Sequence, residues 1–215
     1  MNKKQHQADF RKLSETRRRE KILYSNLTDG IAAKLVELVN EKTDNKEKVK
    51  ILNEIIDNKG FEIKERNAET KSIIKVFETV KETDKEYGEN MNGARALNSI
   101  GYDVYMLPRH TKSKSFDYIL VKGKQIYTAE LKTIYGENSV DHRLEKAIQQ
   151  SNRLVLNIVG NASSRYVADE IQDFYLKNPH IQEVIVLLGG KPIYVKYGQV
   201  KDKKFTKSFM DRWAR

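Results

Sequence analysis

The chain has 215 residues, enough for one large domain or for a smaller domain with an extension. It contains no cysteine, which excludes disulfide bonds and thiolate-bound zinc or iron–sulfur centres. The formal net charge of +10 favours a polyanionic partner, nucleic acid first and an anionic membrane surface second. No apolar run reaches the length of a membrane span, and the charged N-terminus lacks the apolar stretch of a secretory signal, so we expect neither.

Residues 1–80 are dense in lysine, glutamate and asparagine and are expected to be helical. Apolar residues recur at helical spacing in IAAKLVELV (31–39) and in VKILNEII (49–56). We therefore expect an α-helical N-terminal segment that serves as an arm, a small bundle or a linker. No catalytic constellation is found in it.

From residue 81 the pattern is typical of an α/β domain. A helix with Ala94 and Leu97 on one face ends at Gly101, and strands are expected over 102–107, 116–121 and 125–133. A helix near 140–151, a buried strand over 153–159, a second helix and a hairpin around Gly189 follow. This order predicts a mixed sheet flanked by helices over residues 81–200. Residues 201–215 form a basic tail that either docks as a short helix or stays loose.

The stretch FDYILVKGKQIYTAELKT (116–133) places charged residues on a predicted hairpin. Glu130 and Lys132 are two apart on one strand and share a face, and a turn near Lys122 brings Asp117 opposite one of them. Magnesium takes one or two protein carboxylates and keeps several waters, so Asp117 and Glu130 are candidate metal ligands. A neighbouring lysine can orient water or offset charge on a phosphate. The simpler alternative is an exposed cross-strand ion pair.

The pattern Asp117…Glu130-Leu131-Lys132, in an αβββαβ order, resembles the PD-(D/E)XK nuclease superfamily, with Phe116 in place of the usual proline. More narrowly, residues 86–197 resemble the C-terminal toxin domains of CdiA-type contact-dependent growth inhibition proteins. The pieces that carry this likeness are Glu89-Asn90-x-x-Gly93-Ala94, Phe116-Asp117-Tyr118 and Ala129-Glu130-Leu131-Lys132-Thr133. The resemblance covers about half the chain and leaves the N-terminal segment outside.

The resemblance implies a restriction-endonuclease-like fold and a nuclease toxin acting on tRNA or DNA. It implies a divalent metal on Asp117 and Glu130, most simply Mg²⁺ with Zn²⁺ or Mn²⁺ as alternatives, and a catalytic Lys132. Glu89 would complete the acidic cluster, and Gln149 or Gln150, of which we choose Gln150, would add a polar group. A cognate immunity protein would be the partner. The chain would act in the cytoplasm of the producing or target cell, delivered within a larger secreted or phage protein.

Several residues and functions stay open beside this interpretation. His110, Lys112 and Lys114 lie in a basic loop before the hairpin and are candidate nucleic-acid contacts. Tyr127 and Tyr135 flank the Glu-x-Lys triplet, where they either stack on bases or pack in the sheet. The alternative functions are a restriction or repair endonuclease, a metal-independent ribonuclease that uses His110, and a non-catalytic nucleic-acid-binding or phage structural module.

Overall fold

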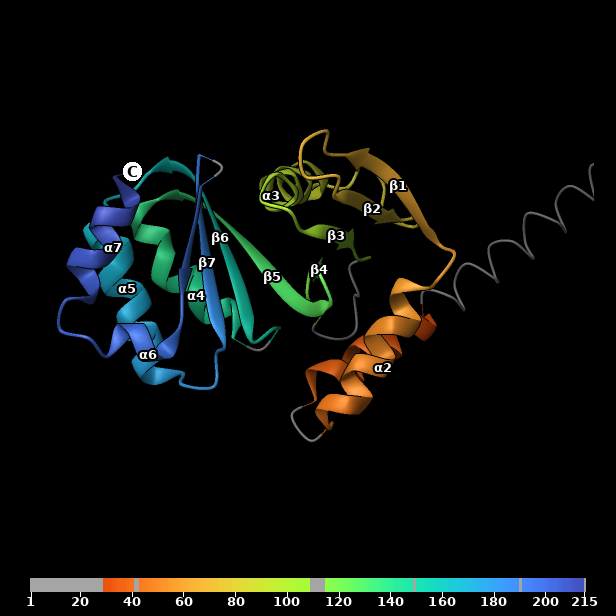
Figure 1. The fold of residues 1–215 in the computed structure, drawn as a ribbon, viewed down its shortest axis with the longest axis horizontal. Helices are drawn as coiled ribbons and strands as arrows, with labels where there is room; N and C mark the ends of the chain where they lie inside the picture. Colours follow the sequence, from red (N-terminus) through yellow and green to blue (C-terminus); the bar gives the residue numbers. More distant parts are fainter. Residues whose placement is uncertain (1–28, 41–42, 109–114, 149, 190, 215) are drawn as a thin grey trace, which may run out of the picture.

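The computed structural model describes residues 29–40, 43–108, 115–148, 150–189 and 191–214. They form one eight-stranded sheet in which the strands lie side by side in chain order (Figure 1). The strands are β1 Phe61–Arg66, β2 Ile73–Phe77, β3 Asp103–Met106, β4 Tyr118–Lys122, β5 Gln125–Gly136, β6 Arg153–Asn161, β7 Glu183–Leu188 and β8 Lys191–Val195. The helices are α2 Asn45–Ile56, α3 Tyr87–Ser99, α4 Val140–Ala147, α5 Ser164–Lys177, α6 Tyr197–Val200 and α7 Phe205–Trp213, and residues 29–39 are also helical.

The sheet is mixed. The pairs β1–β2, β3–β4, β4–β5 and β7–β8 are antiparallel, whereas β2–β3, β5–β6 and β6–β7 are parallel. The run α3-β3-β4-β5-α4-β6 reproduces the predicted αβββαβ order. The prediction of a mixed α/β sheet flanked by helices is confirmed.

One face of the sheet packs against α3. Side chains that alternate along the strands, among them Val104, Leu120 and Leu131, form a buried cluster with Leu97 of the helix. The helix approaches closely at Gly93, where an added Cβ would lie 2.7 Å from Leu131 Cδ2. Only glycine fits this contact without a shift of the Leu131 and Tyr118 side chains or of the helix.

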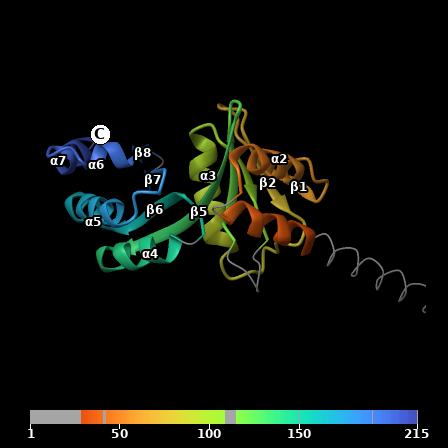
Figure 2. The same cartoon turned by 90° about the horizontal axis from the view of Figure 1, so that it is seen from below.

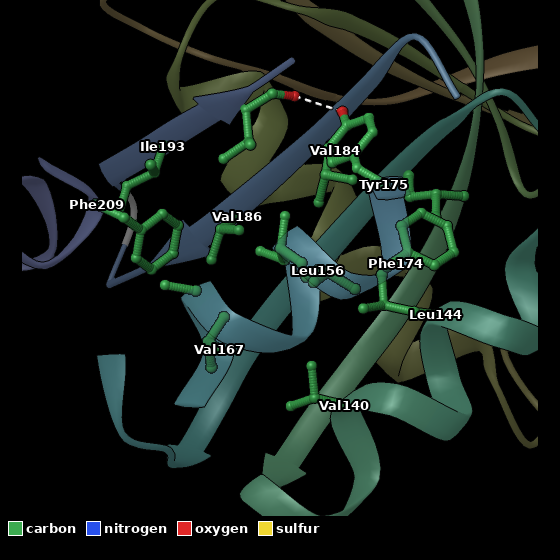
Figure 3. Close-up of a cluster of buried hydrophobic side chains, with 14 of the residues drawn as sticks. Val140, Leu144, Leu156, Val167, Phe174, Tyr175, Val184, Val186, Ile193 and Phe209 are labelled. Carbon is green, nitrogen blue, oxygen red and sulfur yellow. Dashed lines mark hydrogen bonds between the residues drawn. The ribbon is translucent and has the colours of Figure 1, made fainter. Parts of the chain in front are cut away.

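The other face carries two separate groups of helices. The helix of residues 29–39 and α2 cover β2–β4, in a cluster that includes Leu35, Ile55 and Ile119. Helices α4, α5 and α7 cover β5–β8, and Figure 3 shows Val140 and Leu144 of α4 beside Leu156 in this second cluster. Tyr175 is fully buried there, and its hydroxyl donates to the backbone oxygen of Val195 at 2.6 Å, the dashed line in Figure 3.

One sequence-based prediction about segments needs correction. Strands β1 and β2 lie within the segment expected to be helical, and the clusters under α3 and under α2 include residues from both sides of residue 80. For the basic tail, the structure shows the docked alternative, in which Phe205 and Phe209 of α7 are buried. In the described part of the chain, no helix combines the length and apolar character that a bilayer crossing requires.

Candidate active site

The sheet divides along β5, which changes its partner in mid-strand. Residues Gln125 to Ala129 pair with β4, and from Glu130 onward the strand pairs with β6. Figure 2 shows β5 running between the group of α4 and α5 and the group of α2 and α3. The ends of β4 and β6 therefore form a fork around Glu130, an interruption of the sheet where side chains replace backbone partners.

Asp117 lies in this fork, one residue before β4 begins. Its backbone oxygen accepts a hydrogen bond from the Leu107 amide at 3.0 Å, which continues the pairing with β3. Its carboxylate Oδ2 accepts from the Leu131 amide of β5 at 2.9 Å. Since Tyr118 pairs with Ala129, Asp117 stands opposite Glu130, one of the two positions that the predicted hairpin left open.

Glu130 is almost completely buried, with 1% of its surface exposed. Its Oε1 accepts a hydrogen bond from Lys132 Nζ, while its Oε2 is buried and has no hydrogen-bond donor among the described residues. Burial raises the pKa of Glu130 far above its ordinary range, and the neighbouring charge of Asp117 raises it further, although Lys132 opposes both effects.

The two carboxyl groups interact strongly. Burial also raises the pKa of Asp117, against the Leu131 amide and the Lys132 charge, and the charge of Asp117 raises the pKa of Glu130. Two neighbouring carboxylates cannot both be ionised cheaply, so the native state favours a proton on one of them. A divalent cation offers the same compensation, and the unpartnered Oε2 of Glu130 is an available ligand atom.

Gln150 completes the site from the segment after α4. Its Nε2 donates to the backbone oxygen of Ser115 at 3.1 Å, and its Oε1 accepts from Lys132 Nζ at 3.4 Å. These contacts fix the orientation of the amide and hold Lys132 between two acceptors. The structure therefore brings four predicted residues together, namely Asp117, Glu130, Lys132 and Gln150. Gln149 lies outside the described residues.

Glu89 does not make the contacts predicted for it. Its Oε1 accepts from the hydroxyl of Tyr135 at 2.8 Å, on the exposed surface of the face that α3 covers. The α3 carboxylate whose charge raises the pKa of Asp117 is Glu86, at the N-cap of the helix. Glu86 was missed because sequence spacing shows where a helix begins only to within one or two residues.

Among the described residues, no group of three or more His, Cys, Asp and Glu side chains is arranged to hold a metal ion. The site offers two carboxylates, Asp117 and Glu130, which is the number that magnesium takes from a protein when substrate and water supply the rest. The donor set suits Mg²⁺ or Mn²⁺ better than Zn²⁺, which prefers nitrogen and sulfur ligands. His110, Lys112 and Lys114 lie outside the described residues.

Comparisons with known proteins give one distant likeness. No protein-family model and no curated protein matches the chain. Among solved structures, it is similar to a CdiA-CT/CdiI toxin and immunity complex from Burkholderia pseudomallei, with a TM-score of 0.40 and 20% sequence identity. The likeness covers 55% of this chain and 89% of that one. At this level it is too distant to transfer a function.

Proposed function

We propose that the chain is a metal-dependent nuclease that hydrolyses phosphodiester bonds at the β4–β5 fork. The observation that carries this proposal is the placement of a half-buried Asp117 opposite a buried Glu130, which has an unpartnered oxygen beside Lys132. A buried oxygen without a partner destabilises a fold unless a ligand such as a cation binds it. Buried groups with perturbed pKa values are also concentrated at functional sites.

Each residue of the site has a distinct role in this proposal. Asp117 and Glu130 hold the cation, which when bound polarises the phosphate and lowers the pKa of a bound water. The ammonium group of Lys132 orients the attacking water and offsets negative charge that develops on the phosphate. Gln150 positions Lys132 and ties it to the chain at Ser115, immediately after the basic sequence of residues 109–114.

The substrate in this proposal is tRNA or DNA, in line with the net charge of +10. The resemblance to CdiA-type toxin domains supports the use of the nuclease as a toxin effector, carried within a larger secreted or phage protein. Such a toxin needs an immunity protein that blocks the site, and an acidic one would complement the basic surface.

A cleavage assay tests the proposed activity. Total tRNA and plasmid DNA are incubated with the protein in Mg²⁺ and in excess chelator, and in parallel with the variants Glu130→Gln, Asp117→Asn and Glu145→Gln. Glu145 is an exposed residue of α4 and serves as the control. We expect cleavage that requires metal, a loss of at least a hundredfold in the first two variants, and full activity in the control. Cleavage that persists in chelator, or in Glu130→Gln, would refute the proposed mechanism.

A second candidate is a nucleic-acid-binding module without catalysis. The hydrogen bonds of Lys132 to Glu130 and of Asp117 to the Leu131 amide favour it, because they also serve to close the fork structurally. This candidate predicts salt-sensitive binding to nucleic acid that is the same in the wild type and in Glu130→Gln, with no cleavage under any metal condition.

A further inference from the structure

The face of β5 opposite Glu130 carries a second group of polar and aromatic side chains, which we name the β5–β6 patch: Thr133, Tyr135, Asn157 and Val159. Thr133 and Asn157 are register partners, and Tyr135 follows two residues after Thr133 on the same face, where its hydroxyl reaches Glu89 of α3. The pairing of β5 with β6 shifts its register between Ile134 and Gly136, beside Val159. Helix α3 packs on Leu131 but leaves Tyr135 57% and Val159 51% exposed. This face of the sheet is therefore open to solvent at Tyr135 and Val159.

The floor of the patch holds one polar group that the fold does not satisfy. The Thr133 hydroxyl is buried and has no hydrogen-bond partner among the described residues, and its register partner Asn157 is 8% exposed. Buried polar groups are nearly always hydrogen-bonded, so the unpartnered hydroxyl needs an explanation. A hydroxyl and an amide together offer donors and acceptors to a ligand that presents both.

The rim of the patch is a prearranged aromatic ring. The Tyr135 hydroxyl donates to Glu89 Oε1 at 2.8 Å, so the side chain is held at both ends while most of its surface faces solvent. Close packing limits the backbone as well, since a Cβ on Gly160 would lie 1.9 Å from the Tyr135 oxygen. An exposed ring that loses little freedom on contact is suited to stacking on a planar ligand.

The patch and the Glu130 carboxyl lie on opposite faces of β5. In the described residues no strand pairs with β5 on its β4 side beyond Ala129, so a nucleic-acid strand can reach both by crossing this open edge. The Leu131 amide donates to Asp117, and Tyr135 follows four residues later, about 13 Å along a strand. A nucleic-acid strand with one phosphate at the fork has its neighbouring nucleotides within this range, because bases along one strand are about 3.4 Å apart when stacked.

We propose that the β5–β6 patch binds one unpaired base of the substrate strand, with Tyr135 stacking on the base and Thr133 and Asn157 bonding its edge. The inference deepens the proposed nuclease function and rests on it for the identity of the substrate. Recognition of an unpaired base selects single-stranded or loop regions over regular duplex, because a paired base exposes neither its face nor its pairing edge.

Binding to short labelled single-stranded RNA and DNA oligonucleotides, measured by fluorescence anisotropy in chelator, tests the stacking. We expect Tyr135→Ala to weaken binding about tenfold and Tyr135→Phe to keep most of it, because the ring and not the hydroxyl contacts the base. Leu176→Ala, which trims an equally exposed apolar side chain on α5, is the control and leaves binding unchanged. Equal affinities for the wild type and Tyr135→Ala would overturn the inference.

Thr133→Val separates recognition from a purely structural role. Valine has nearly the same shape and removes the unpartnered hydroxyl, so the thermal midpoint of unfolding stays equal or rises. If the hydroxyl bonds a base, the same variant binds oligonucleotides several-fold more weakly and prefers a different base at one position near the cleaved bond. A variant that is more stable and binds with unchanged affinity and base preference would show that the hydroxyl has no ligand.

These readouts distinguish the failure of either proposal. If oligonucleotide binding depends on Tyr135 but no metal condition yields cleavage, the base-binding inference stands and the nuclease proposal fails. If metal-dependent cleavage is lost in Glu130→Gln but is identical in rate and position in Tyr135→Ala, the nuclease proposal stands and the inference fails.

Discussion

At the scale of single residues, the protein keeps a carboxylate where a neutral group would be more stable. Glu130 is 1% exposed, and only one of its oxygens has a donor, Lys132. Natural proteins tolerate such local destabilisation where function requires it. This cost can be measured. The native state holds a proton that the unfolded state releases, so the free energy of unfolding depends on pH.

Glu130→Gln is expected to stabilise the protein while abolishing cleavage. The raised pKa of Glu130 means that the free energy of unfolding of the wild type falls as pH rises above the ordinary glutamate value near 4.5. The glutamine amide can donate to Asp117 and still accept from Lys132, so we expect a gain of about 1–2 kcal/mol at pH 8 and a smaller one at pH 5. Urea unfolding in chelator at both pH values measures the difference. A gain that is the same at both would contradict burial of the charge.

At the scale of elements, the sequence predicted what short-range patterns control. The Lys122-Gly123-Lys124 turn set the hairpin register and therefore placed Asp117 opposite Glu130. The sequence-based prediction failed at β1. Its FEIKER sequence forms an edge strand in which no residue is fully buried, so it lacks the apolar alternation that identifies a strand. The prediction also failed for Glu89, because the side of α3 that meets the fork depends on helix packing. The close approach at Gly93 sets that packing, and sequence patterns do not reveal it.

The packing contact between α3 and β5 can be tested at two glycines of the helix, Gly93 and Gly88. A Cβ at Gly93 meets Leu131 and the Tyr118 hydroxyl at 2.7–2.9 Å, whereas a Cβ at Gly88 meets nothing within 4 Å. We expect Gly93→Ala to lower the free energy of unfolding by about 1–3 kcal/mol and to reduce cleavage through displacement of Leu131, which donates to Asp117. Gly88→Ala removes the flexibility of glycine and is expected to be neutral or stabilising. Equal effects of the two changes in chemical denaturation would mean that the contact does not matter.

At the scale of the whole molecule, the sheet joins clusters that lie far apart in sequence. The cluster under the N-terminal helices includes Phe116, which precedes Asp117, and Ile119, two residues after it. The cluster under α5 and α7 continues across β6 and β7. Because β5 pairs with both halves of the sheet, we expect the described residues to unfold in one cooperative step. Residues 29–60 then serve as support for the site and not as a separable arm.

The single tryptophan, Trp213 of α7, reports on this cooperativity from the opposite end of the molecule. Leu35, 1% exposed in the helix of residues 29–39, contributes only to the N-terminal cluster. We expect Leu35→Ala to cost about 2–5 kcal/mol and to shift the unfolding midpoint seen by tryptophan fluorescence as much as the one seen by circular dichroism. Val36→Ala, exposed on the same helix, is the control. A fluorescence midpoint that stays in place would show two independent domains.

The hydrogen bond from the Leu131 amide to the Asp117 carboxylate has a spectroscopic consequence. In most of β5 an amide proton faces a backbone carbonyl, whose charge does not change with conditions. At Leu131 it faces an ionisable group, so its NMR chemical shift should follow the protonation of the carboxyl pair and should move again when a cation takes the place of the proton. One backbone resonance thereby reports the occupancy of the site without substrate, label or mutation.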